Sequence, residues 1–202
     1  MDQQLQALLT ELYEEGQRND AQAQERRKKR LNLEPETAQL LSVLVRSGKR
    51  TRLLEIGTSN GYSTIWLAWA ARLNGGTVIS IDREAEKHQL ADANLRRASL
   101  RDVVQLVQGD ATSIVADLAG PFDFVFFDAD RFSAPAQLNL LLPRLTPDVL
   151  VLADNVHSHP DEIADYLATV QNLPDFEHMV LPVGKGLSLA YRHQPSQSVC
   201  RS

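Results

Sequence analysis

Short apolar runs alternate with amphipathic segments along most of the chain, and this alternation predicts the fold. The apolar runs cover residues 53–56, 78–81, 103–107, 122–127 and 149–153. Segments with helical periodicity follow them, at residues 63–73, 84–98, 113–118, 135–145 and 161–170. Continuous apolar strands joined by helices are typical of a parallel sheet that is covered on both faces. The pattern therefore predicts an α/β protein with a doubly wound, Rossmann-like sheet.

Two further runs near the end of the chain predict a different kind of strand pair. Residues 177–181 and 187–191 are separated by a short segment that contains proline and two glycines. A connection of this length suits an antiparallel hairpin at the end of the sheet. Together with the five earlier runs, it predicts a seven-stranded, mostly parallel sheet with an antiparallel C-terminal hairpin strand.

The beginning of the chain predicts helices that precede the alternating region. Four leucines between residues 5 and 12 fall at helical spacing, and Pro35 suits the first turn of a second helix that stops near Gly48. We therefore expect an N-terminal helical extension at residues 1–34, one main domain at residues 35–193 and a disordered tail at residues 194–202. The single cysteine, Cys200, lies in that tail and predicts neither a disulfide nor a thiolate metal site.

A run of five cations at residues 26–30 has two interpretations. A basic run can bind nucleic acid, but cations beside Gln and Glu on a helix more often form a solvated face, which is the interpretation that we favour. The net charge of −5 also disfavours partners such as nucleic acid or an anionic membrane. No apolar run approaches the roughly 20 residues of a membrane span, so we expect a cytoplasmic protein with a small-molecule partner.

The ends of the first three predicted strands carry residues suited to a nucleotide-like ligand, because ligands bind at the carboxyl ends of such strands. Gly57 and Gly61 permit a sharp turn and a close approach to a ligand, although an ordinary strand-to-helix turn also explains them. Ser59 replaces the middle glycine that a dinucleotide site requires. Asp82 can accept hydrogen bonds from ribose hydroxyls or cap the next helix, and the short acidic segment 109–111 can hold an adenine amino group.

Oxygen-bearing side chains follow the next two predicted strands. Asp128 comes after the fourth run, and Asp154 with Asn155 comes after the fifth. Three such donors at one edge of a sheet suit a hard divalent cation, with Mg²⁺ favoured and Ca²⁺ or Mn²⁺ able to substitute. Helix capping or hydrogen bonds within loops are the alternative roles for these side chains.

Four motifs in this order resemble a known family. They are Glu55-Ile56-Gly57-Thr58 with Gly61-Tyr62-Ser63-Thr64, then Phe126-Phe127-Asp128-Ala129-Asp130, then Ala153-Asp154-Asn155, and last Leu181-Pro182-Val183-Gly184. They are similar to those of the class I methyltransferases that use S-adenosylmethionine (SAM), and in particular to the catechol and caffeoyl-CoA O-methyltransferases and their bacterial relatives. The resemblance covers about residues 35–192.

The resemblance implies an enzyme that transfers the methyl group of SAM to a hydroxyl of a small catechol-like or phenolic acceptor, and a homodimer. Gly57 and Ser63 would line the methionine end of SAM, Asp82 the ribose, and Asp110 with Ala111 the adenine. The implied metal ligands are Asp128, Asp154 and Asn155. The full implied cofactor site is Glu55, which would organise the loop, with Gly57, Thr58, Ser59, Gly61, Tyr62, Ser63, Asp82, Arg83, Gly109, Asp110, Ala111 and Asp128.

Two positions depart from the family pattern. The relatives carry a lysine base three residues after the first metal aspartate, and this chain has Arg131, which keeps its proton and cannot be a base. We assign catalytic roles to Asp128 and Arg131, the latter stabilising the oxyanion; His157 and His159 are alternative bases, although loop histidines more often lie at the surface. Lys185 stands where many relatives have aspartate, and it either favours an acidic acceptor or, as we expect, faces water.

Three other functions remain open from the sequence. The first is a SAM-dependent enzyme with another acceptor, although the segment after the fourth strand lacks the Asn-Pro-Pro or Asp-Pro-Pro stretch that clamps a flipped base. The second is a SAM-binding protein with impaired catalysis, which Arg131 suggests. The third is an NAD-dependent oxidoreductase, which Ser59 disfavours.

Overall fold

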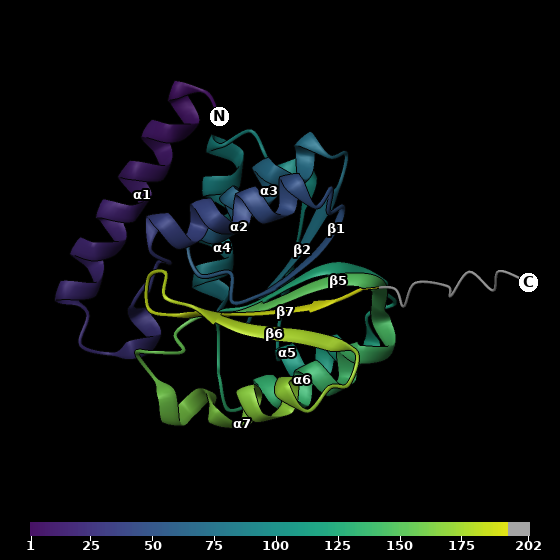
Figure 1. The fold of residues 1–202 in the computed structure, drawn as a ribbon. Coiled ribbons are helices and arrows are strands. Elements are labelled where there is room, and N and C mark those ends of the chain that lie inside the picture. The colour runs from purple at the N-terminus through teal and green to yellow at the C-terminus, as the bar shows by residue number, and fades with distance from the viewer. Residues whose placement is uncertain (194–202) are drawn as a thin grey trace, which may run out of the picture.

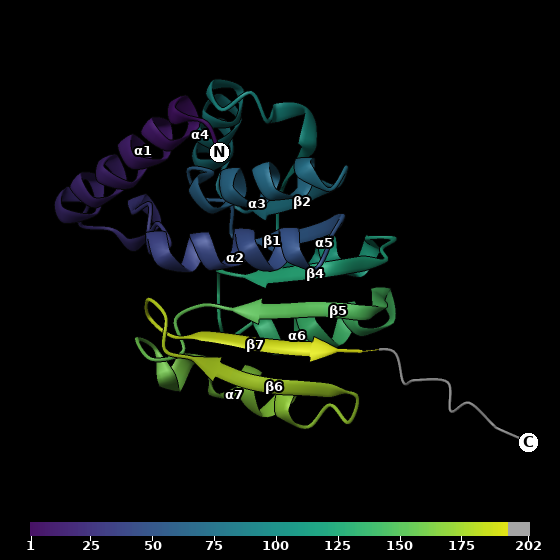
Figure 2. The same cartoon turned by 45° about the horizontal axis from the view of Figure 1, so that its top comes forward.

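A single sheet divides the molecule into two helical layers. The computed structural model describes residues 1–193, and within them seven strands form one sheet in the order β3-β2-β1-β4-β5-β7-β6 (Figures 1 and 2). The strands are β1 (Arg52–Ile56), β2 (Thr77–Asp82), β3 (Val104–Gln108), β4 (Phe122–Phe127), β5 (Leu145–Ala153), β6 (Phe176–Leu181) and β7 (Leu187–Arg192). β1 to β5 pair in parallel, and β7 runs antiparallel to both β5 and β6. The predicted fold class and C-terminal hairpin are confirmed.

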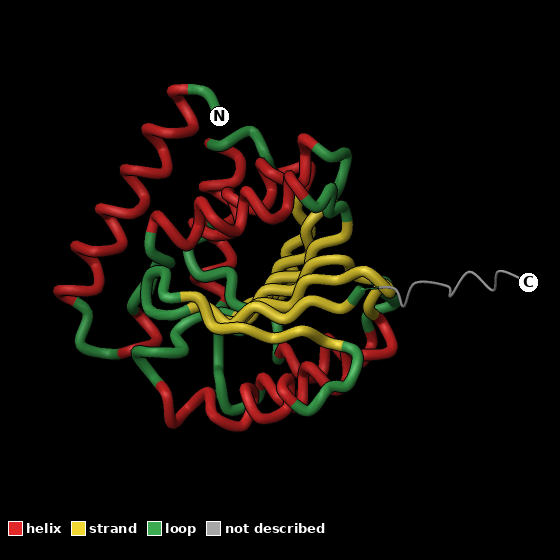
Figure 3. Tube along the Cα trace, in the orientation of Figure 1, coloured by secondary structure: helices red, strands yellow, loops and turns green. Residues whose placement is uncertain are grey.

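The helices lie on the two faces of the sheet (Figure 3). They are α1 (Gln3–Gln22), α2 (Pro35–Ser47), α3 (Tyr62–Leu73), α4 (Ala85–Arg97), α5 (Ala111–Asp117), α6 (Ala134–Leu141) and α7 (Pro160–Gln171). Helices α1 to α4 gather on one side and α5 to α7 on the other (Figure 1). The helix expected at 135–145 ends as an α-helix at Leu141 and continues as a 3₁₀ turn at Leu142–Arg144. Pro143 accounts for this change because it has no backbone N–H to continue the ladder.

Alternation along the central strands produces a separate core on each face. Leu53, Phe124 and Phe126 pack in the first core with α1 to α4, whereas their neighbours Leu54 and Val125 pack in the second core with α5 to α7. Successive strand residues point to opposite faces, so continuous apolar runs are required when both faces are covered. The leucine stripe of α1 is buried in the first core.

The basic run after α1 differs from the expected helical face. The α-helix ends at Gln22, and the run forms a 3₁₀ turn at Arg26–Lys28 followed by extended chain. The Asp20 carboxylate accepts hydrogen bonds from the backbone N–H groups of Arg30 and Leu31 at 2.6 and 2.8 Å, which turns the chain back. The run is exposed through Lys28, but the helix that we expected there was wrong.

The division into residues 1–34, 35–193 and 194–202 remains a prediction. The predicted tail and Cys200 lie outside the described residues. Across residues 1–193, no helix has the length and apolar character needed to cross a membrane.

Candidate active site

Strand register brings the predicted site residues to one edge of the sheet. Ile56 pairs with Phe127, and Phe127 pairs with Ala153, so the three strands end in one row. The next residue of each strand, namely Gly57, Asp128 or Asp154, therefore lies at the same edge. The sheet order reverses between β1 and β4, and such a switch point is where open α/β sheets bind ligands.

A cleft of about 640 Å³ lies at this edge, and it contains most of the predicted site. The predicted residues that line it are Gly57, Thr58, Ser59, Tyr62, Ser63, Asp82, Arg83, Gly109, Ala111, Asp128, Arg131, Asp154 and Asn155. Glu55, Gly61 and Asp110 are not among its lining residues. A cleft of this size is in the range of small-molecule and cofactor sites.

The loop after β1 has the backbone geometry that its glycines suggested. Gly57 and Gly61 have φ of +113° and +86°, and Gly61 is the N-cap of α3. Asp82 holds this loop, because its Oδ2 accepts the Ser59 N–H at 2.8 Å while its Oδ1 accepts the Glu84 N–H at 3.0 Å. The two roles expected for Asp82, capping the next helix and binding a ribose hydroxyl, therefore remain compatible. Each carboxylate oxygen has a further lone pair that can accept a hydrogen bond from a ribose hydroxyl.

Glu55 lies beneath the loop and binds three hydroxyl groups. Ser63 Oγ donates to its Oε1 at 2.6 Å, and Thr64 Oγ1 and Ser80 Oγ both donate to its Oε2 at 2.5 Å. Burial raises the pKa of the Glu55 carboxyl to about 7 and outweighs these three hydrogen bonds, which favour the ionised form. Glu55 joins β1, β2 and the start of α3, which supports the organising role that we expected.

The raised pKa of Glu55 predicts a pH-dependent stability. Below pH 4.5 the carboxyl is protonated in both states; between pH 4.5 and about 7 it ionises in the unfolded chain only, so stability falls as pH rises. The loss should be on the order of 3 kcal/mol once the pH exceeds 7. The neutral variant Glu55→Gln should lack this pH-dependent loss of stability. Its melting temperature should therefore rise relative to that of the wild type between pH 5 and pH 8. A difference that stays constant with pH would contradict the assignment.

Asp110 caps the helix that follows it, and its predicted adenine contact remains a prediction. Its Oδ1 caps α5 by accepting the Ser113 N–H at 2.9 Å, and its Oδ2 lies 3.4 Å from Arg83 Nη2. The backbone hydrogen bond from Ser113 lowers the pKa of the Asp110 carboxyl. The neighbouring residues Gly109 and Ala111 line the cleft.

Asp154 is buried and Asp128 is half-buried, and their carboxyls interact electrostatically. Burial raises the pKa of Asp154 to about 6, and burial together with the Asp154 charge raises the pKa of Asp128. Asp154 is 4% exposed, and its Oδ1 has no hydrogen-bond partner among the described residues. A buried carboxyl with an unpartnered oxygen, beside a second and half-buried carboxyl, suits a cation, since buried charges are normally paired. Within residues 1–193 no three His, Cys, Asp or Glu side chains cluster as a metal site, so Asn155 would be the third ligand.

Arg131 contacts the side-chain amide oxygen of Asn155. Its Nη2 donates to Asn155 Oδ1 at 2.5 Å, and its Nη1 donates to Glu162 Oε2 at 2.8 Å. An amide oxygen has two lone pairs, so this bond leaves one of them for a metal. The Arg131 side chain is only 11% exposed, which gives the guanidinium one defined position. Sequence reasoning missed Glu162, because an acidic residue in the first turn of a helix is expected from the helix dipole alone.

Lys185 is exposed, as expected, but it also has an ionic partner at the cleft. Lys185 Nζ pairs with Glu34 Oε1 at 2.6 Å, and Lys185 lines the cleft while remaining 45% exposed. The loop after β5 places it there, since the N–H groups of Val156 and His157 donate to the carbonyls of Gly186 and Lys185. Glu34 precedes α2, and the sequence contains no signal that it pairs with a lysine of the C-terminal hairpin.

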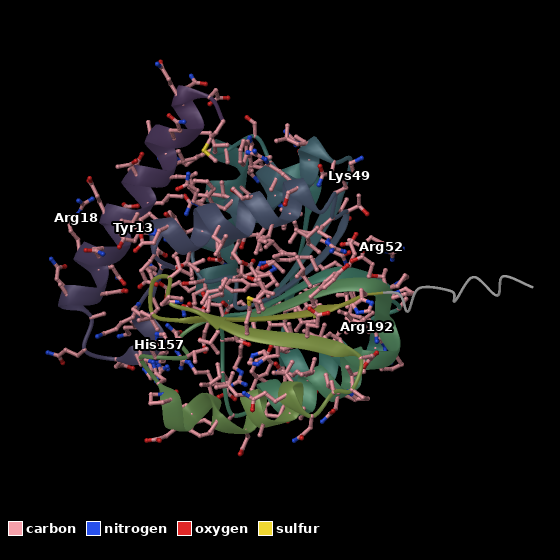
Figure 4. All side chains as sticks on the ribbon, in the orientation of Figure 1. Tyr13, Arg18, Lys49, Arg52, His157 and Arg192 are labelled. Carbon is pink, nitrogen blue, oxygen red and sulfur yellow. The ribbon has the colours of Figure 1, made fainter. Side chains whose placement is uncertain are left out.

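The two loop histidines have different positions. His157 is exposed and lies at the end of the sheet opposite Arg52 and Arg192 (Figure 4). His159 is half-buried and lines the cleft, with Ser158 Oγ 2.9 Å from its Nδ1. Burial, and after it the positive charge of Arg131, lowers the pKa of His159. His157 has the surface position that we expected, whereas His159 is half-buried at the cleft.

The segment 24–33 forms a wall of the cleft that the sequence did not predict. Arg26, Arg27, Lys29 and Arg30 all line the cleft. Ser59 Oγ donates to the Arg30 carbonyl at 2.6 Å, which ties the segment to the loop after β1. This contact joins residues that are far apart in the sequence and uses a backbone carbonyl, so no side-chain pattern signals it.

The sheet order, the glycine loop after β1 and the acidic residue that ends β2 define an α/β protein of Rossmann-like type. Residues 54–156 match the family model described as a methyltransferase domain, and the chain belongs to this family.

Relatives and solved structures that are named as O-methyltransferases support this assignment. The catechol O-methyltransferase of Niastella koreensis is 35% identical over 130 residues, which are 62% of this chain and 58% of that protein. A putative O-methyltransferase from Klebsiella pneumoniae has a TM-score of 0.79 at 26% identity and covers 96% of this chain and 91% of its own. The Bacillus cereus O-methyltransferase in complex with SAH has the same TM-score and identity, with 92% and 90% covered. The chain spans 58% of the length of the curated relatives that it matches first.

Proposed function

We propose that the protein is a SAM-dependent O-methyltransferase that methylates a hydroxyl of a small catechol-like or phenolic acceptor. One observation carries this proposal: the glycine loop after β1 and the carboxyls of Asp128 and Asp154 line a single cleft. The relatives of this chain that are named as O-methyltransferases agree with this proposal. The family resemblance leads us to propose that the protein is a homodimer. Its acidic net charge leads us to propose that neither nucleic acid nor a membrane is a partner.

SAM would lie along the ends of β1 to β4. When bound, it supplies an activated methyl group on a sulfonium. Gly57 and Ser63 would bind its methionine end, Asp82 the ribose hydroxyls, and Asp110 with Ala111 the adenine; of these, Gly57, Ser63, Asp82 and Ala111 line the cleft. The Gly57 backbone allows a close approach because it carries no side chain at φ of +113°. The wall formed by residues 24–33 would restrict the access of water to the cofactor.

The residues present fit a divalent cation, which we propose to be Mg²⁺, with Ca²⁺ or Mn²⁺ as substitutes. Asp128, Asp154 and Asn155 would hold it, and the unpartnered Oδ1 of Asp154 is the observation that favours it. A bound divalent cation would lower the pKa of an acceptor hydroxyl and orient it.

Arg131 would stabilise the negative charge that develops on the acceptor oxygen. A guanidinium keeps its proton throughout the accessible pH range, so Arg131 acts as a fixed cation and not as a base. Glu162 and the Asn155 amide hold it in place from two directions. Preorganised charge of this kind needs no rearrangement as the reaction proceeds.

Two measurements test the proposed function. Calorimetric titration with SAM should give saturable binding, whereas NAD should give none. Methyl transfer to catechol or caffeate, followed with and without Mg²⁺, should then require both SAM and the cation. Binding of SAM without transfer to either acceptor would indicate another acceptor or impaired catalysis, and failure to bind SAM at millimolar concentration would refute the proposal.

A further inference from the structure

Phe132 is a large apolar side chain exposed at the cleft. Its relative exposure is 70%, the highest among the exposed large hydrophobic residues of the described chain, which are Leu31, Val43, Leu73, Phe132, Met179 and Val180. Of these six, Leu31 and Phe132 line the cleft. Single exposed apolar residues are common on protein surfaces, but an exposed aromatic ring at a cleft that carries polar catalytic groups is a candidate for ligand binding.

The loop that carries Phe132 has a defined conformation. Asp130 organises it, since its Oδ1 accepts the Phe132 N–H at 3.2 Å and its Oδ2 accepts the Ser133 hydroxyl at 2.5 Å. The Ala134 N–H donates to the Arg131 carbonyl at 3.3 Å and leads the chain into α6. Phe132 is therefore presented by a hydrogen-bonded turn, and little ordering of this loop is needed when a ligand binds.

Phe132 and Arg131, whose guanidinium contacts Asn155, line the same cleft. A group that places a hydroxyl near Arg131 and extends along the cleft can therefore reach Phe132. We propose that Phe132 is the specificity residue against which the aromatic ring of the acceptor packs. This inference rests on the proposed function and adds to it the residue that selects an aromatic acceptor. An aromatic pair contributes binding beyond the area that it buries.

The test compares Phe132→Ala with Phe132→Trp, which keeps an aromatic face. With SAM saturating, Phe132→Ala should raise the KM for catechol about tenfold and change kcat less than threefold, a split expected when ground-state and transition-state binding are lost together. Phe132→Trp should retain a KM within about threefold of the wild type. Calorimetric binding of catechol to the protein saturated with S-adenosylhomocysteine and Mg²⁺ should weaken by the same tenfold in Phe132→Ala, which gives a readout independent of turnover.

Leu73→Ala is the matched control, because Leu73 is 61% exposed and does not line the cleft. It should leave the KM for catechol and the affinity for SAM unchanged. The inference is overturned if Phe132→Ala keeps the wild-type KM, or if it mainly weakens SAM binding. It is also overturned if Phe132→Ala converts a dimer into a monomer at unchanged KM, since a second copy then covers the ring. Wild-type protein that binds no SAM would refute the proposed function itself.

Discussion

Asp154→Ala is expected to abolish metal-dependent methyl transfer while SAM affinity stays within a few fold of the wild type. Asp154 lies at the end of β5, and its Oδ1 has no hydrogen-bond partner within residues 1–193, which suits a metal ligand. Its removal should lower kcat/KM by at least about 100-fold, because a direct ligand should matter more than the outer groups that orient ligands. Initial rates with Mg²⁺ and calorimetric SAM titration measure the two effects separately.

A thermal melt separates this functional loss from a folding defect. The substitution removes a buried carboxyl that burial disfavours in its charged form, so the melting temperature should stay the same or rise. Asp165→Ala makes the same chemical change on the exposed face of α7, outside the cleft, and should leave both activity and stability unchanged. An equal loss of SAM affinity and turnover in Asp154→Ala would contradict the division between cofactor and metal residues.

Of the substitutions predicted here, Gly57→Ala is expected to cause the largest loss in the free energy of unfolding. An added Cβ would lie 2.3 Å from the Asp128 carbonyl oxygen and 2.7 Å from its carbonyl carbon, at a φ of +113°. Both atoms belong to the backbone that follows β4, so relief of the contact would require β1 and β4 to move apart. We expect a loss of about 3 kcal/mol or more from strain and overpacking together, with a melting temperature lower by about 10 °C. SAM affinity should fall as well.

Gly75→Ala isolates the cost of the backbone conformation. Gly75 has a φ of +70°, but an added Cβ would meet no atom within 4 Å. Its substitution should cost about 1 kcal/mol, since a left-handed conformation disfavours any side chain without a clash. Chemical denaturation of both variants gives the two free energies of unfolding. If Gly57→Ala costs no more than Gly75→Ala, the close approach of β1 and β4 at the site is not as described.

Many of the site residues could be predicted because they are tied to strand ends. Gly57, Asp128 and Asp154 each follow an apolar run directly, and parallel strands place such residues at one edge of the sheet. The role of Glu55 was also foreseen in outline, although its three hydroxyl partners come from two other elements. The capping role of Asp110 is visible in the structure, because an acidic residue before a helix can serve as a cap, whereas its adenine contact stays a prediction.

Charged residues outside the strand ends could not be placed from the sequence. The composition around Lys185 and in the run at residues 26–30 is that of a solvated surface, yet Lys185, Arg26, Arg27, Lys29 and Arg30 line the cleft. The partners that bring them there, among them Glu34 and Asp20, lie on other elements or are reached through the backbone. Pairing of this kind depends on the distance between elements, and local composition does not specify that distance.

The sequence by itself determined the alternation of strands and helices, the layered sheet and the chemistry at the strand ends. It did so because burial on both faces requires continuous apolar strands, and because the direction of a parallel strand decides which end carries the ligand. The tertiary structure alone decided the wall at residues 24–33, the contact of Arg131 with Glu162 and Asn155, and the exposure of Phe132 at the cleft. Each of these depends on how separate elements pack together, and periodicity within one element contains no information about that packing.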